Sequence, residues 1–227
     1  MLKNIRKKLS RKGIPKNLTE LKCVNCSYSQ FGEDIYISHL IGKNVQSGTY
    51  VDVGCYEPIH YSNTYLFYKR GWKGLCIDPN PALSRKWAKH RPRDNFINLG
   101  VSQSTAELGY MEHRKYPALN FLFERNSEPE ELNDPSYSLT RTIKTKTLFE
   151  ILEQNISEDI DFLNIDCEGM DLEVIESMKL ERYRPRVICI EDRSKPFHGN
   201  IHDLLNSHGY CFSASIGISK LYTVESL

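Results

Sequence analysis

The sequence lacks a hydrophobic run close to the roughly 18 residues that a membrane-spanning helix requires. No apolar stretch follows its basic N-terminus, so a secretory signal is not expected. Internal repeats and low-complexity tracts are also missing. The 227 residues, 40% of them hydrophobic and 26% charged, therefore predict one globular domain that is large enough to bury a core.

The seven cysteines do not show the pattern of a disulfide frame or of a zinc site. Cys23 and Cys26 form one C-x-x-C motif, whereas a structural zinc site would need a second pair. Four of the other cysteines lie in or beside apolar runs, as buried thiols do in a reducing compartment: Cys55, Cys76, Cys167 and Cys189. We therefore expect a cytoplasmic protein.

Acidic residues are missing from positions 1–19, which carry seven Lys and Arg. The remaining chain is acidic, with a net charge of about −6, and this argues against nucleic acid as a partner. Residues 1–28 are expected to be a basic N-terminal extension of a single domain over 29–227. Because its apolar residues share one helical face, the extension is interpreted either as a solubilising tail or as a weak contact with the anionic inner membrane surface.

Strand-like and helix-like patterns alternate from residue 49 onward. The expected strands are "GTYVDVG", "GLCID", "NFINLGVS", "IDFLNID" and "PRVICIED", followed by "YCFSAS" and "KLYTVES" across a short turn. A short extra strand is expected at "AELGYME", and residues 113–140, which lack periodicity, are expected to form a substrate loop or lid. Helical crossovers make neighbouring strands parallel, whereas a short turn makes them antiparallel. The pattern predicts an α/β protein with a seven-stranded, mostly parallel sheet and a C-terminal antiparallel hairpin, the Rossmann-like fold of class I methyltransferases.

Acidic residues end the first two strands, at the edge where open α/β sheets bind ligands. Asp52 and Gly54 end the first strand, and Asp78 ends the second. Gly54 would let the backbone approach a ligand closely, and the Asp78 carboxylate could accept both hydroxyls of a ribose. Both acids could instead cap the helices that follow them.

The glycines of a pyrophosphate-binding loop are missing after Gly54, where "CYEP" follows. A phosphate-binding loop with its lysine is missing as well. A nucleoside cofactor without a pyrophosphate, such as S-adenosylmethionine, fits this pattern better than a dinucleotide.

Six segments, in order along the chain, resemble the FkbM-type methyltransferases: "SQFGEDIYI" (29–37), "YVDVGCYEPIHYSNT" (50–64), "GWKGLCIDPNP" (71–81), "INLGVS" (97–102), "DFLNIDCEGMDLEVIES" (161–177) and "RPRVICIED" (184–192). The resemblance implies S-adenosylmethionine-dependent O-methylation, often of a sugar hydroxyl in a glycan or natural product, as in polysaccharide biosynthesis. It implies that Asp166 lies near the reacting methyl group. It also implies the residues that bind the cofactor. The methionine end would be lined by Asp52, Val53 and Gly54, the ribose would be held by Asp78, and the adenine would be bordered by Val101 and Ser102. Gln30, in the first of the six segments, would belong to the same site.

An acceptor hydroxyl must lose its proton during methyl transfer, and acidic side chains at the strand ends could accept this proton or bind a metal ion that promotes its loss. Asp166 ends the fourth strand, and Glu191 and Asp192 end the fifth, so the three carboxylates could converge and bind Mg²⁺ or Mn²⁺. The last two could equally pair with arginines as surface charge. His198, a candidate general base near neutral pH, and Glu168, two residues after Asp166, are further catalytic candidates.

Two other functions stay open at this point. The domain could be a binding module that holds S-adenosylmethionine without catalysis. It could also be a nicotinamide-dependent oxidoreductase, although such an enzyme would need a second glycine near Gly54.

Overall fold

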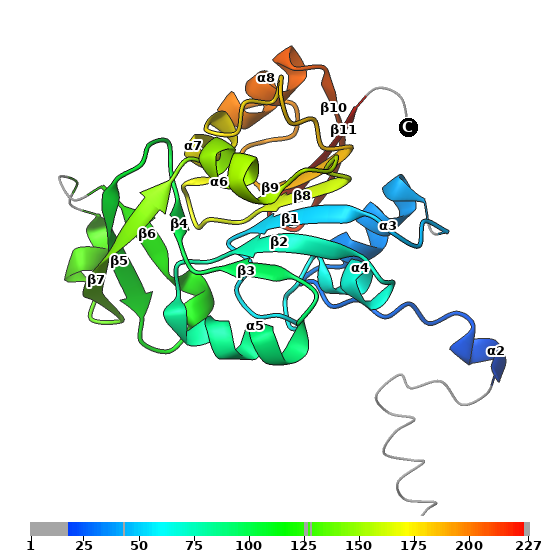
Figure 1. The fold of residues 1–227 in the computed structure, drawn as a ribbon, viewed down its shortest axis with the longest axis horizontal. Helices are drawn as coiled ribbons and strands as arrows, with labels where there is room; N and C mark the ends of the chain where they lie inside the picture. Colours follow the sequence, from blue (N-terminus) through cyan, green and yellow to red (C-terminus); the bar gives the residue numbers. More distant parts are fainter. Residues whose placement is uncertain (1–17, 43, 125–126, 128, 225–227) are drawn as a thin grey trace, which may run out of the picture.

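The computed structural model describes residues 18–42, 44–124, 127 and 129–224 (Figure 1). Most of the basic N-terminal extension lies outside these residues, so its contact with a membrane stays a prediction. Within the described ranges, no helix combines the length and the apolar character that crossing a membrane would require.

A seven-stranded sheet lies at the centre of the fold, in the order β10-β11-β9-β8-β1-β2-β3. Its strands are β1 (Thr49–Val53), β2 (Lys73–Ile77), β3 (Asn95–Ile97), β8 (Phe162–Ile165), β9 (Val187–Glu191), β10 (Tyr210–Ile216) and β11 (Ser219–Val224). Five strands that are consecutive in the sheet run parallel, namely β9, β8, β1, β2 and β3, whereas β11 is antiparallel to both β9 and β10. This arrangement confirms the predicted sheet and its C-terminal hairpin. Every residue of β1 and β9 is buried, as expected for parallel strands that are covered on both faces.

Helices cover both faces of this sheet (Figure 1). Alternate residues of each strand point to opposite faces, so each strand contributes side chains to a core on either side. On one face, Val51 and Val53 of β1 belong to a core with α6 (Leu148–Asn155), α7 (Asp171–Glu176) and α8 (Asn200–Ser207). On the other face, Tyr50 belongs to a core with α3 (Glu33–Ile41), α4 (Tyr65–Lys69) and α5 (Ser84–His90). The short helix α2 (Leu18–Leu21) buries no residue.

A second sheet of four strands, in the order β4-β7-β5-β6, stands beside the first (left in Figure 1). Its strands are β4 (Gly100–Val101), β5 (Glu107–His113), β6 (Phe121–Phe123) and β7 (Tyr137–Lys146). One sequence-based expectation was therefore wrong in detail, because the strand expected at "NFINLGVS" is split between β3 and β4, which belong to different sheets. The segment 113–140, expected to form a substrate loop or lid, contains β6 and the first residues of β7. Three residues are too few to show a strand period, and β6 forms only because it pairs with β5.

A buried charge pair fixes the end of α5 against the central sheet. Arg91 Nε donates to Asp94 Oδ2 at 2.6 Å, and neither side chain is exposed to solvent. The Arg91 guanidinium also donates to the Tyr50 hydroxyl at 2.7 Å and to Thr64 Oγ1 at 3.0 Å. Asp94 accepts the backbone N–H of Gly74 as well, so the pair links β1, β2 and the segment before α4.

We predict that Asp94→Asn lowers the free energy of unfolding by about 3–5 kcal/mol, because it leaves the Arg91 charge buried without its partner. Denaturant unfolding followed by circular dichroism measures this loss. Glu158→Gln is the matched control, since its partner Lys73 is well exposed and the pair should contribute little. Equal effects of the two substitutions would contradict the structural role of the buried pair.

Candidate active site

A cavity lies at the carboxyl ends of β1, β2 and β8, between the two sheets. It is lined by Val53, Gly54, Tyr56, Ile77, Asp78, Pro79, Leu99, Val101, Tyr110, Pro117, Ala118, Asn120, Phe121, Leu122, Asp166, Cys167, Glu168 and Met170. Six of these residues were candidates from the sequence. We call this space the cofactor cavity below, because it has the position where open α/β sheets bind their ligands.

The close approach of two strand ends forms one wall of the cofactor cavity. Gly54, directly after β1, has a φ of 75°, which glycine adopts without strain. A Cβ atom at this position would lie 1.7 Å from the carbonyl oxygen of Asp166, directly after β8. Any side chain at residue 54 would therefore push the Asp166 backbone out of place.

Asp78 reaches the cofactor cavity from the end of β2, with 7% of the residue exposed. Its Oδ2 accepts the backbone N–H of Tyr56 at 2.9 Å, and its Oδ1 accepts that of Asn80 at 2.8 Å. Burial raises the pKa of this carboxyl to about 6, against the effect of the two N–H donors, which lower it. Each carboxylate oxygen has a second lone pair, so Asp78 can still accept hydroxyl groups from a ligand.

Asp52 is fully buried behind the wall of the cofactor cavity and does not line it. Its Oδ2 accepts the hydroxyl of Thr64 at 2.6 Å, and its Oδ1 accepts the amide of Asn164 at 2.9 Å. Burial raises the pKa of Asp52, while nearby Arg91 and these two hydrogen bonds act in the opposite direction. The Asp52 side chain therefore holds the strand ends together from the other face of β1.

Three more candidates from the sequence lie away from the cavity lining. Ser102 is 3% exposed, and its hydroxyl donates to the Ser104 carbonyl at 2.7 Å and lies 2.8 Å from Thr145 Oγ1. Gln30 and His198 are exposed on loops, and neither lines a cavity around the strand ends. The structure does not bring His198 together with Asp166.

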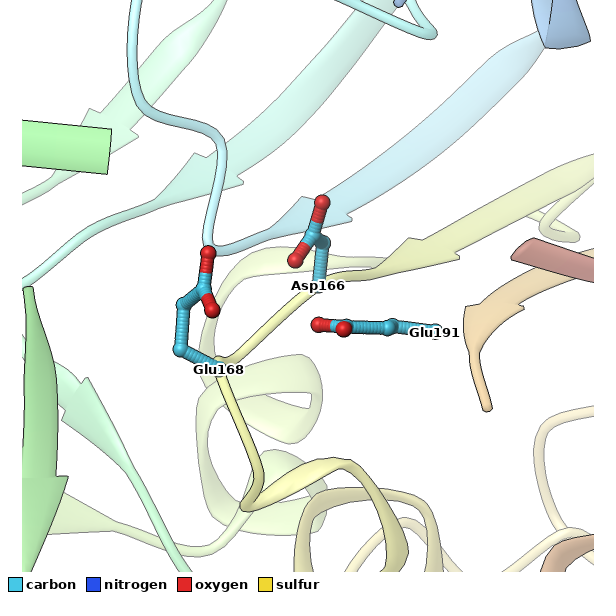
Figure 2. A group of neighbouring side chains, drawn as sticks. All are labelled: Asp166, Glu168 and Glu191. Carbon is cyan, nitrogen blue, oxygen red and sulfur yellow. The ribbon is translucent and has the colours of Figure 1, made fainter. Parts of the chain in front are cut away.

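Three carboxylates converge beside the end of β8 (Figure 2). One oxygen from each of Asp166, Glu168 and Glu191 lies within 4.8 Å of the others. We call these three residues the carboxylate cluster. Arg193 donates to Glu191 Oε1 at 2.9 Å and lies 3.9 Å from Glu168 Oε2, but 70% of its side chain is exposed.

Asp192, a predicted metal ligand, is not part of the carboxylate cluster, and Glu168 occurs there instead. The Oδ2 atom of Asp192 accepts from Lys220 Nζ at 3.0 Å, and Oδ1 accepts the backbone N–H of Ser194 at 2.8 Å. Lys220 is only 1% exposed, so this is a buried ion pair. The alternative of pairing with arginines as surface charge is wrong for Asp192, whose partner is a buried lysine of β11, whereas Glu191 does pair with Arg193.

Burial and the charges of neighbouring carboxylates favour the protonated forms of Asp166 and Glu168. Burial, followed by the charges of Glu191, Asp171 and Glu168, raises the pKa of Asp166 well above its usual range. Burial and the charge of Glu191 raise the pKa of Glu168 to about 7, although Arg193 acts in the opposite direction. Carboxyl groups with such values can exchange protons near neutral pH.

The loop after β8 holds Glu168 in an uncommon backbone conformation. Glu168 has a φ of 49°, a left-handed value that costs energy for a residue with a side chain. Asp171, at the start of α7, stabilises the loop by accepting the N–H groups of Cys167 at 2.9 Å and of Gly169 at 3.1 Å. The strained turn directs the Glu168 carboxylate toward Asp166 and Glu191 (Figure 2).

A second cavity of about 500 Å³ opens next to the cofactor cavity. It is lined by Leu119, Phe121, Glu131, Tyr137, Glu168, Gly169, Asp171, Leu172, Glu191, Asp192, Arg193 and Ile201. We call it the acceptor groove. Glu168 and Phe121 line both spaces, so a group bound in the groove lies next to a ligand in the cofactor cavity. Phe121 was not predicted to be a site residue, because its segment shows no periodicity.

Comparison with known proteins gives one family match. Residues 52–212 match the family described as the methyltransferase FkbM domain. No curated protein matches the sequence.

Two solved structures are similar at low sequence identity. A TehB-like SAM-dependent methyltransferase from Corynebacterium glutamicum is 12% identical, with a TM-score of 0.41 over 99% of this chain and 96% of that chain. The 1,6-didemethyltoxoflavin-N1-methyltransferase of Burkholderia thailandensis, with S-adenosylhomocysteine bound, is 12% identical, with a TM-score of 0.39 over 86% of this chain and 77% of that chain.

We predict that Thr64→Val lowers the free energy of unfolding by about 1–3 kcal/mol, because the buried Asp52 carboxylate loses a hydrogen-bond donor. Thermal or denaturant unfolding measures the change. Thr223→Val on β11 makes the same exchange at a half-buried strand position and should change stability by no more than about 0.5 kcal/mol. If the two variants unfold alike, the hydrogen bond to Asp52 is not a support of the strand ends.

Proposed function

The chain belongs to the FkbM methyltransferase family, and we propose that it is an S-adenosylmethionine-dependent O-methyltransferase that acts on a sugar hydroxyl of a glycan, a nucleotide-linked sugar or a natural product. The observation that carries this proposal is the position of Glu168, which lines both the cofactor cavity and the acceptor groove. An acceptor hydroxyl beside this carboxylate lies next to the cofactor and has a proton acceptor within reach.

The lining of the cofactor cavity fits the parts of S-adenosylmethionine. Asp78 provides carboxylate oxygens for the ribose hydroxyls, and Leu99 and Val101 provide an apolar border for the adenine. Gly54 lines the cavity and lets the ends of β1 and β8 lie close together, because a side chain there would meet the Asp166 carbonyl. Bound S-adenosylmethionine would supply an electrophilic methyl group.

The residues of this chain would then bind and orient the acceptor hydroxyl. Asp166 and Glu168 extend from the strand end at which the two cavities meet, so they can fix the direction of the hydroxyl by hydrogen bonds. The pKa of Glu168, about 7, suits a group that accepts the hydroxyl proton near neutral pH. Phe121, shared by both cavities, contributes an apolar wall that limits the access of water.

The charge of the acceptor groove favours an uncharged polyhydroxylated group as the methylated moiety. Five of its lining residues are acidic. Arg193 is the basic residue in the lining, and it is already paired with Glu191. A phosphate placed among these carboxylates would be repelled. In a nucleotide-linked or lipid-linked acceptor, the phosphates would therefore lie outside the acidic lining.

The most direct test of the proposed function is mass spectrometry of ligands that remain bound to the purified protein, with S-adenosylhomocysteine as the expected species. Incubation with S-adenosylmethionine and a panel of sugars and nucleotide sugars should then yield a product that has gained one methyl group. Thermal stabilisation by NAD but not by S-adenosylhomocysteine would instead indicate an oxidoreductase. Cofactor binding without methylation of any acceptor in cell extracts would indicate an inert binding module.

We predict that Asp78→Ala weakens S-adenosylhomocysteine binding by about 2–4 kcal/mol, which corresponds to roughly 30- to 700-fold in Kd, because two hydrogen bonds to a charged acceptor are lost. Calorimetric titration measures the affinity. In the wild type, the affinity should be constant above pH 6 and decrease below it, since Asp78 has a pKa of about 6 and accepts hydroxyls best when ionised. An unchanged affinity in the variant would remove Asp78 from the cofactor site.

We predict that Asp166→Asn lowers kcat by about 100-fold or more, because the acceptor hydroxyl loses a carboxyl group that orients it and can exchange its proton, while S-adenosylhomocysteine affinity changes little. Steady-state kinetics and calorimetry separate the two effects. Glu173→Gln on α7 removes a nearby carboxylate outside both cavities and is the matched control. Wild-type turnover in Asp166→Asn would exclude Asp166 from the reaction.

A further inference from the structure

The carboxylate cluster contains a buried polar atom that the protein leaves without a partner. Glu191 is 6% exposed, and its Oε2 has no hydrogen-bond partner among the described residues. Its other oxygen, Oε1, is the atom that accepts from Arg193. An unpaired buried carboxylate oxygen is costly unless a ligand satisfies it.

The spacing of the carboxylate cluster suits a single metal ion. A divalent cation with oxygen ligands at about 2.0–2.6 Å separates those ligands by at most about 4–5 Å. One oxygen from each of Asp166, Glu168 and Glu191 lies within 4.8 Å of the other two. The donors are all carboxylate oxygens, a set that selects hard cations rather than zinc or copper.

The protein's own cation does not complete the cluster. Arg193 is 70% exposed and contacts Glu191 on one oxygen, while its distance to Glu168 is 3.9 Å. The other nearby basic side chain, Lys220, is held by Asp192 and by the Lys195 carbonyl. Three converging carboxyl groups therefore face one peripheral arginine, whose hydrogen bond goes to Glu191.

We propose that Asp166, Glu168 and Glu191 bind one divalent cation, Mg²⁺ or Mn²⁺, where the cofactor cavity meets the acceptor groove. Each carboxylate would supply one oxygen, and the second oxygens of Asp166 and Glu168 would stay available, whereas that of Glu191 accepts from Arg193. The role of the ion in catalysis rests on the proposed function, whereas the site itself rests on the geometry of the cluster.

A cation bound by these three residues would hold the acceptor hydroxyl and would supply stabilisation of the negative charge on its oxygen. The proton passes to a free carboxylate oxygen of the cluster. A bond forms between the hydroxyl oxygen and the methyl carbon as the carbon–sulfur bond breaks, and the electron pair of that bond stays on sulfur. No oxidant or reductant is needed.

The test is a titration of the full chain, stripped with chelator and free of cofactor, with Mn²⁺. Electron paramagnetic resonance measures the free ion, and calorimetry measures the stoichiometry. We expect one saturable site per chain, from which Mg²⁺ displaces Mn²⁺. Glu168→Gln and Glu191→Gln should each weaken Mn²⁺ binding by about tenfold or more, because each removes a charged ligand.

Glu131→Gln is the matched control, since it removes a carboxylate from the acceptor groove outside the cluster, and its Mn²⁺ affinity should stay within about twofold of the wild type. Absence of saturable Mn²⁺ binding to the folded wild type would overturn the proposal, and so would an equal loss in the control variant. S-adenosylhomocysteine binding is measured separately on the metal-free chain. Cofactor binding without Mn²⁺ binding would reject the metal site alone, whereas Mn²⁺ binding without cofactor binding would reject the proposed function alone.

Discussion

The contact between Gly54 and the carbonyl of Asp166 is the constraint on which the rest of the site depends. It allows the ends of β1 and β8 to approach so closely that residue 54 has no room for a side chain. The same contact fixes the backbone from which the Asp166 and Glu168 side chains extend. One glycine thus determines both a wall of the cofactor cavity and the position of two of the three clustered carboxylates.

Negative charge at the strand ends is divided between structural and chemical uses. Asp52, Asp94, Asp171 and Asp192 are satisfied by donors of the protein, which are hydroxyl, amide, guanidinium, ammonium and backbone N–H groups. The carboxylate cluster is the contrasting case, because its groups face one another and Glu191 keeps an unpaired oxygen. Burial and neighbouring charges raise the pKa of Asp166 and Glu168, which makes these two groups suited to bind a cation or a proton.

Periodicity predicted the elements of the central sheet, because every strand that ends at the site is a buried run followed by a helix. Local pattern could not predict contacts between distant residues. Asp192 pairs with Lys220 of β11, and Asp52 with Thr64 and Asn164, so distant side chains keep both acids out of the carboxylate cluster and out of the lining of the cofactor cavity. Glu168 replaced Asp192 in the cluster because a strained loop turns it inward, and strain of this kind has no periodic signal.

If the proposed function is correct, S-adenosylhomocysteine binds in the cofactor cavity and lies against the carboxylate cluster. The most direct measurement is a crystal structure of the protein grown with S-adenosylhomocysteine. We expect the ribose hydroxyls within hydrogen-bond distance of the Asp78 carboxylate. We expect the sulfur atom on the side of the cavity that Asp166 and Glu168 line. A ligand bound elsewhere, or one whose ribose faces away from Asp78, would contradict this expectation.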